Sequence, residues 1–274
     1  MRTAIVFLFL MGMPLAAAAQ TTTITITNSA CTNPPVLADV PQPAAPSVAA
    51  GTAAARNRDF ALARANFRPL AESGDADAER AMGQLLMQNC TGLQDKKAAV
   101  DWLTKAAAAN NVVAQNLLAH AYMLGQGVAQ DDEKAFALYS QVAATGNANA
   151  QMELGYLYSS GRGVARDRYQ GLQWSVKAAE QGNAVALANI ANAYMRGEEL
   201  ARDPDRAAYF LALANERATP AQRNEVMTTS QEIRQAVSVE DLGRASKRAL
   251  RWSLGKDSLS DVMDEAASRH DKHS

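Results

Sequence analysis

The sequence has few aromatic residues and little net charge, and each shortage excludes a class of protein. Phe, Trp and Tyr together make up only 6% of the 274 residues. This disfavours a large globular core and, in an alanine-rich chain, favours closely packed helices. The formal net charge is −1, so there is no basic excess of the kind that binds nucleic acid or an anionic membrane. We therefore expect neither of these as a partner.

Common catalytic and metal-binding motifs are also missing. The sequence contains no G-x-S-x-G nucleophile elbow, no Walker phosphate-binding loop and no H-E-x-x-H zinc helix. His270 and His273 form an H-x-x-H pair near the C-terminus, but two ligands on a chain end do not define a specific metal site. We therefore expect no enzymatic activity, no bound metal and no cofactor.

The first 19 residues are typical of a cleavable secretory signal. Arg2 supplies a positive charge, an apolar run follows from Ala4 to Leu15, and a small-residue stretch ends at Ala19. The run is about 12 residues long, shorter than the roughly 17 to 25 that cross a bilayer, and no later segment is comparably apolar. Cys31 follows a polar stretch rather than the apolar run, so we expect no lipid anchor. The sequence predicts cleavage after Ala19 and a periplasmic or secreted protein without membrane insertion.

A shift of 36 residues aligns the chain with itself. One aligned column contains only alanine, at Ala78, Ala114, Ala150 and Ala186. Apolar residues recur four places further on, at Met82, Leu118, Leu154 and Ile190. They recur again eight places further on, at Leu86, Tyr122, Tyr158 and Tyr194. These spacings form one stripe of an amphipathic helix, so each unit is predicted to begin with a helix that packs through this face.

Two further patterns mark a second helix in each unit. Glycine pairs end the first helix, because glycine tolerates the positive φ of a tight reversal, at Gly125, Gly127, Gly161 and Gly163. An aspartate then recurs at the same period and is expected to accept hydrogen bonds from the first N–H groups of the second helix. This column comprises Asp59, Asp95, Asp131, Asp167 and Asp203.

The motif A-x-x-x-L-G-x-x-Y-x-x-G-x-G-V-x-x-D, followed by a helix that ends A-A-E-Q-G-N, resembles the Sel1-like repeat (SLR), a relative of the tetratricopeptide repeat. The resemblance is closest over residues 150–183 and implies an all-α, right-handed α/α superhelical solenoid of 36-residue helix-turn-helix units. It further implies that the first helices line a concave groove used mostly for protein binding. Some exported relatives with a cysteine pair in each repeat have been associated with β-lactams, but this chain lacks those pairs.

The pattern divides the chain into five parts. After the signal peptide, residues 1–19, we expect a flexible Pro/Ala/Thr-rich leader over 20–57, which becomes helical near the first recognisable unit. The repeat array follows over 58–218, with units that start at 78, 114, 150 and 186 after a partial unit in which only the second helix is recognisable. A capping hairpin is expected over 219–254, as one helix to about 236 and a second from 238. The tail, 255–274, is expected to contain one short amphipathic helix.

Some positions of the first helices lie off the apolar stripe and are predicted, by the tetratricopeptide analogy, to face the groove. The polar and aromatic members are Arg80, Gln84, Asn116, His120, Tyr156 and Asn192. Methionines in the same region either offer adaptable apolar contact to a partner or fill gaps between repeats; they are Met123, Met152 and Met195. His120 has no Cys or His companion in the pattern, so it is interpreted as a contact residue rather than a catalyst.

These features favour an exported scaffold or adaptor of the bacterial envelope that binds a protein segment in its groove. One alternative is a periplasmic regulator of a membrane sensor protein, which would use the same surface. Another is a cell-wall or β-lactam binding protein that uses the groove as a cleft. The sequence does not identify the partner, and it does not separate the scaffold from the regulator.

Two cysteines, Cys31 and Cys90, are predicted to form a disulfide, because the expected compartment is oxidising. In the exported protein, alkylation without reductant followed by mass spectrometry should therefore modify neither thiol. Reduction before alkylation should modify both. The alternative, two unpaired thiols, would be shown by two alkylated cysteines in the unreduced sample.

Overall fold

A computed structural model describes residues 43–88, 94–250 and 256–271. The signal peptide and both cysteines lie outside these residues. The described chain forms fourteen α-helices and no strand. The helices are α1 (Val48–Arg56), α2 (Phe60–Glu72), α3 (Ala76–Met87), α4 (Lys96–Ala108), α5 (Val112–Leu124), α6 (Asp132–Ala144), α7 (Ala148–Ser160), α8 (Arg168–Glu180), α9 (Ala184–Arg196), α10 (Pro204–Arg217), α11 (Arg223–Thr229), α12 (Gln231–Ala236), α13 (Val239–Leu250) and α14 (Lys256–His270).

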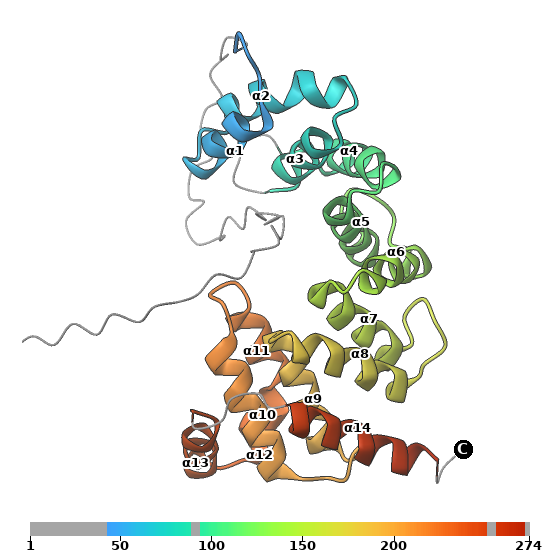
Figure 1. Ribbon diagram of the computed structural model, residues 1–274, viewed down its shortest axis with the longest axis vertical. Coiled ribbons are helices and arrows are strands. Elements are labelled where there is room, and N and C mark those ends of the chain that lie inside the picture. The colour runs from blue at the N-terminus through green and yellow to red at the C-terminus, as the bar shows by residue number, and fades with distance from the viewer. Residues whose placement is uncertain (1–42, 89–93, 251–255, 272–274) are drawn as a thin grey trace, which may run out of the picture.

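The first ten helices form a solenoid of five antiparallel pairs. Each helix packs on the next one along the chain, and the pairs stack into a curved array (Figure 1). In that view α3 and α5 lie on the inner side of the curve, and α4 and α6 lie on the outer side. The prediction of an all-helical repeat array is confirmed. None of the described helices is both long and apolar enough to span a membrane.

Side-chain caps fix where the helices begin. All five aspartates of the repeat column cap the second helix of a pair, and each accepts a hydrogen bond of 2.9 to 3.0 Å from the N–H group three residues on. The first helices use a second set of caps, at Asp75, Asn111, Asn147 and Asn183. Helices α3, α5, α7 and α9 therefore begin two residues before the alanine column.

Small residues let the paired helices approach closely. The alanines of the repeat column are completely buried. Between α7 and α8, a Cβ added to Gly155 would lie 2.8 Å from the carbonyl oxygen of Gly171, and one added to Gly171 would lie 2.7 Å from that of Gly155. Any larger residue at these two positions would force the backbones of α7 and α8 apart. The short distance between the two helices therefore requires glycine at both positions.

Each glycine loop packs on the preceding pair. A Cβ added to Gly163 would collide with the carbonyl group of Asp132, and one added to Gly127 would collide with that of Lys96. Arg162, in the same loop as Gly163, donates to both carboxylate oxygens of Asp132 at 2.6 and 3.1 Å, and to the carbonyl of Met123 at 2.8 Å. Since such bidentate pairs fix geometry as well as charge, the loop holds neighbouring repeats in register.

The predicted leader ends too late in the chain. Its last ten residues are not flexible, because residues 48–56 form α1, the first helix of an additional pair. Small residues are sufficient to pack this helix, because they let it lie very close to α2. A Cβ added to Gly51 would overlap the ring of Phe67. Ala54 and Ala55 are buried in the same contact. The lack of large apolar residues was therefore no obstacle to folding.

The C-terminal hairpin also differs from its prediction. The expected helix over 219–236 begins only at Arg223 and breaks at Ser230 into α11 and α12. Ser230 is completely buried, and its hydroxyl donates to the carbonyl of Val226. The carbonyl of Thr229 accepts a hydrogen bond from Asn192 of α9. These bonds compete with a continuous helix, which accounts for the break.

The last two helices return to the array. Helix α13 packs on α10, and α14 packs on α8. The amphipathic helix predicted in the tail is confirmed as α14, with Leu259, Val262 and Ala266 buried. Glu265 accepts hydrogen bonds from the N–H of Ala201 and from Arg206, each at 2.7 Å. The tail is therefore part of the folded body.

The loop contact predicts a large difference between two glycine substitutions. Gly163→Ala combines a left-handed backbone, φ +70°, with a collision against Asp132. Gly146→Ala has φ +89° but nothing within 4 Å of the added Cβ, so it isolates the cost of backbone strain. We expect Gly146→Ala to lower the free energy of unfolding by about 1 to 2 kcal/mol and Gly163→Ala by at least about 1 kcal/mol more, measured by denaturant unfolding. Equal losses would show that the loop contact does not hold the repeats together.

Candidate functional site: the inner groove and its closed end

The nine residues predicted to face the groove divide by exposure. His120 and Tyr156 are exposed, and 44% of Tyr156 is accessible to solvent. Their positions are equivalent in α5 and α7, one repeat apart. Three others are partly exposed, namely Arg80, Asn116 and Asn192. The remaining four are buried and do not form a binding surface; they are Gln84, Met123, Met152 and Met195.

Of the two roles considered for the methionines, burial supports gap filling and excludes surface contact. Met123 packs in the cluster formed by α5, α6 and α7, and Met152 and Met195 belong to the larger C-terminal cluster. Unbranched, flexible methionine fills irregular gaps between small residues, and the alanine columns create such gaps. Gln84 is also buried, and its side-chain oxygen accepts a hydrogen bond of 2.6 Å from Arg80, which compensates for the loss of water.

His120 is suited to contact rather than to charge pairing. Although its side chain is exposed, desolvation by the surrounding helices lowers its pKa below the ordinary 6.5. The imidazole is therefore neutral at pH 7 and carries one donor and one acceptor nitrogen.

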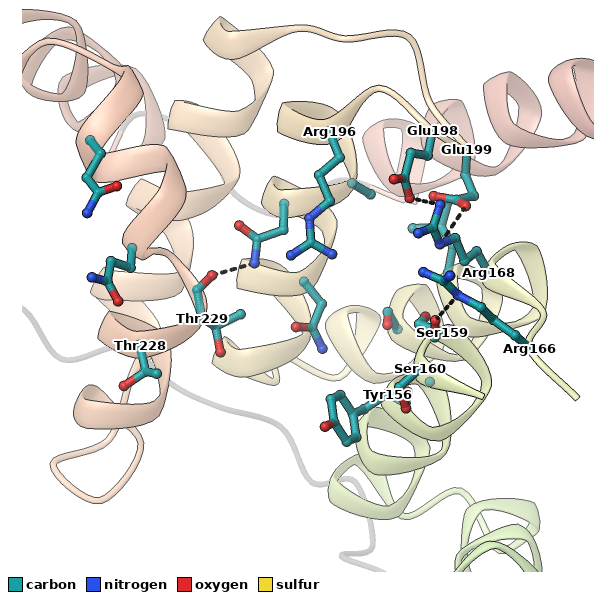
Figure 2. Close-up of a pocket in the computed structure, with 18 residues that line it drawn as sticks. Tyr156, Ser159, Ser160, Arg166, Arg168, Arg196, Glu198, Glu199, Thr228 and Thr229 are labelled. Carbon is teal, nitrogen blue, oxygen red and sulfur yellow. Dashed lines mark hydrogen bonds and ion pairs between the residues drawn. The ribbon is translucent and has the colours of Figure 1, made fainter. Parts of the chain in front are cut away.

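A pocket of about 560 Å³ lies at the C-terminal end of the groove. Its walls come from α7, α8 and α9, and residues of α11 and α12 close the far side (Figure 2). Tyr156 and Asn192 belong to its lining, so the pocket continues the predicted groove surface. It lies within the volume range of small-molecule sites.

Arginines dominate the charge of this pocket. Arg166, Arg168 and Arg196 line it, against Glu198 and Glu199. Arg168 forms an ion pair with Glu198 and a second, longer one of 3.9 Å with Glu199. Desolvation raises the pKa of Glu199. Both acidic residues of the lining are thus paired with Arg168. The side chain of Arg196 points into the pocket (Figure 2).

Asn192 connects the array to the hairpin. Its amide nitrogen donates to the backbone carbonyl of Thr229, between α11 and α12. Its side-chain oxygen is buried and has no hydrogen-bond partner among the described residues. The side chain of Asn192, on α9, therefore already binds the backbone of another segment of the chain, at the end of α11.

Glu153 is a half-buried acid on α7, three residues before Tyr156. Burial raises its pKa to about 7, the negative charge of Glu225 on α11 adds to this effect, and Arg162 opposes it. Burial also raises the pKa of Glu225. Burial and the charge of Glu225 therefore both disfavour ionisation of Glu153, which is partly protonated at neutral pH.

A second cavity of about 460 Å³ lies beside α14, where the rings of Tyr169 and His270 stack with centroids 4.4 Å apart. His270 thus contributes to the docking of α14. Within the described ranges, no group of three or more His, Cys, Asp or Glu residues could hold a metal ion.

The sequence pattern did not reveal the arginines of the pocket. Arg166 and Arg168 flank the capping Asp167, and Arg196 ends α9, so each occupies a position where a solvated charge is ordinary. They come together because α8 and α9 pack side by side and the hairpin folds over them. No spacing in the sequence encodes that fold-back.

The Sel1 repeat family model matches residues 76–111, 112–147, 148–183 and 184–218. These boundaries coincide with the observed starts of α3, α5, α7 and α9. The two descriptions of the repeat unit therefore agree.

Several solved structures are similar to this chain, including the following two. One is a Sel1 repeat protein from Oxalobacter formigenes, at 22% identity and a TM-score of 0.58, over 78% of this chain and 99% of that one. The other is a protective antigen of uropathogenic Escherichia coli strains with an SLR fold, at 26% identity and a TM-score of 0.54. That match covers 77% of this chain and 50% of the antigen. No curated protein matches the chain.

The raised pKa of Glu153 predicts how stability depends on pH. The folded protein binds this proton more tightly than the unfolded chain, so the free energy of unfolding should fall as pH rises from 4.5 to about 7. Glu153→Gln should remove part of that fall and stabilise the protein at pH 8 by about 1 to 3 kcal/mol. Denaturant unfolding at pH 5 and pH 8 measures the difference, and Glu180→Gln, at an exposed position of α8, is the control. If the two variants respond alike, Glu153 is not the group responsible.

Proposed function

Because the chain belongs to the Sel1 repeat family, we propose that it is a protein-binding scaffold that holds a segment of its partner along the inner helices. The observation that carries this proposal is the pair His120 and Tyr156. They occupy equivalent positions in α5 and α7, one repeat apart, and the side chains of both are exposed. An aromatic ring that packing does not require is typical of a contact residue in an interface.

The proposed scaffold acts outside the cytoplasm and without catalysis. The sequence of residues 1–19, with its short apolar run and small-residue end, supports export to the periplasm or the medium. The missing catalytic motifs support a binding role. The partner is a protein of the envelope, and the array presents it with a pre-formed groove.

Crosslinking in living cells tests the proposed surface. A photoreactive amino acid at position 120 or 156 should capture a specific envelope protein. The same residue at position 141 is the control, because Gln141 is exposed on α6, on the outer side of the curve. Capture from position 141 alone would place the partner on the outer face and contradict the proposal.

The captured partner then allows a measurement of affinity. The double variant His120→Ala/Tyr156→Ala should bind it at least about tenfold more weakly, because interface aromatics commonly contribute more than 1 kcal/mol each. Helicity should not change, since both side chains are exposed. Unaltered affinity would show that the partner does not contact these residues.

A further inference from the structure

The proposed inner surface is interrupted at α9. The hairpin of α11 and α12 packs on α9, and Thr228, Thr229, Gln231 and Gln235 close one side of the pocket. A polypeptide that runs along α5 and α7 toward α9 therefore meets the hairpin. It can enter the pocket between α7 and α9, but the direct path beyond α9 is occupied (Figure 2). A binding surface that is blocked at one end favours a polypeptide whose chain terminates there.

The chemistry at the closed end is suited to a carboxylate. The Nε of Arg166 donates a hydrogen bond to the carbonyl of Ser159 at 3.0 Å. Among the described residues this is the one hydrogen bond of the Arg166 guanidinium, so both of its Nη groups can bind a ligand. Arg196 is exposed and points into the same space (Figure 2). Arginine presents its N–H groups in a planar fork that matches the two oxygens of a carboxylate. The lining carries three arginines and two glutamates, and Arg168 is paired with both glutamates.

The pocket also has groups that can bind a peptide backbone. Asn192 already donates to one backbone carbonyl, that of Thr229, and its buried side-chain oxygen is left without a partner among the described residues. Hydroxyl and amide groups of Ser160, Thr228 and Asn189 surround the same space. A volume of about 560 Å³ has room for the last few residues of a chain.

We propose that this pocket binds the free C-terminal carboxylate of the partner, with Arg166 and Arg196 as its ligands and the preceding residues extended past Tyr156 and His120. The proposal rests on the scaffold function above and makes it specific, since the partner is recognised by its C-terminus. An acidic side chain within a partner sequence offers the same carboxylate chemistry, and the experiment separates these two sources.

The test uses a library of random peptides displayed with free C-termini, panned on the purified mature protein. Enriched sequences are synthesised in two forms, with a C-terminal carboxylate and with a C-terminal amide, and their binding is measured by fluorescence anisotropy. Amidation should weaken binding at least about tenfold, as expected for the loss of a charge-assisted hydrogen-bonded pair. This comparison uses the unaltered protein, so it does not depend on the folding of any variant.

Two substitutions locate the interaction. Arg166→Gln and Arg196→Gln should each weaken the carboxylate peptide at least about tenfold and leave the weak binding of the amide nearly unchanged. Arg68→Gln is the control, because Arg68 is exposed on α2, away from the pocket, and pairs with Glu72 at 2.7 Å. Circular dichroism checks that all three variants keep their helicity.

Several outcomes would overturn the proposal. Equal binding of both peptide forms, with loss of binding only when an internal acid is replaced, would assign the pocket to an acidic side chain. Equal effects of Arg68→Gln and Arg196→Gln would mean that charge acts nonspecifically. A library without carboxylate-dependent binders would also contradict it. If crosslinking from positions 120 and 156 still captures a partner, only the C-terminal recognition fails and the scaffold function stands.

Discussion

The close approach of helices across columns of alanine and glycine is the contact on which the rest of the structure depends. Completely buried alanines, and the glycines that face each other between α7 and α8, bring neighbouring backbones together. The same shortage of side-chain volume explains why α1 folds without large apolar residues and why methionines are drawn into the gaps between repeats. Because the inner helices use their small residues for packing, a few large side chains that lie off the packing face, such as Tyr156 and Leu124, remain exposed. The groove surface is therefore a consequence of how the core is built.

Features that depend on local chemistry could be predicted from the sequence. A capping aspartate bonds to an N–H only three residues away, and a glycine with positive φ acts within its own turn, so one column of the repeat contains all the necessary information. Features that depend on distant contacts could not be predicted. The break at Ser230 follows from contacts that include Asn192 on another helix, and the burial of Met152 follows from the packing of the C-terminal cluster. The arginine pocket belongs to the second class, because a fold-back of the chain assembles it.

The C-terminal helices do more than cover the end of the array. A solenoid must shield its last stacking face, and here α13 does so by packing on α10. The preceding hairpin turns the other way, onto α9, where it closes the groove and completes the pocket. One continuous segment thus both caps the array and closes the pocket. The inner surface consequently differs along the array, with a charged pocket at its C-terminal end.

The return of α14 to α8 gives the molecule two unequal ends. In a linear array most contacts are local in sequence, and such arrays can open from a terminus one unit at a time. At the N-terminal end, α1 is held mainly by the adjacent α2. At the other end, Glu265 is bonded to Ala201 and Arg206, so the last pair cannot separate until contacts between distant parts of the chain are broken. Thermal opening should then travel in one direction, from α1 toward the pocket, and the enclosed end of the groove should be the last part of the array to lose its shape.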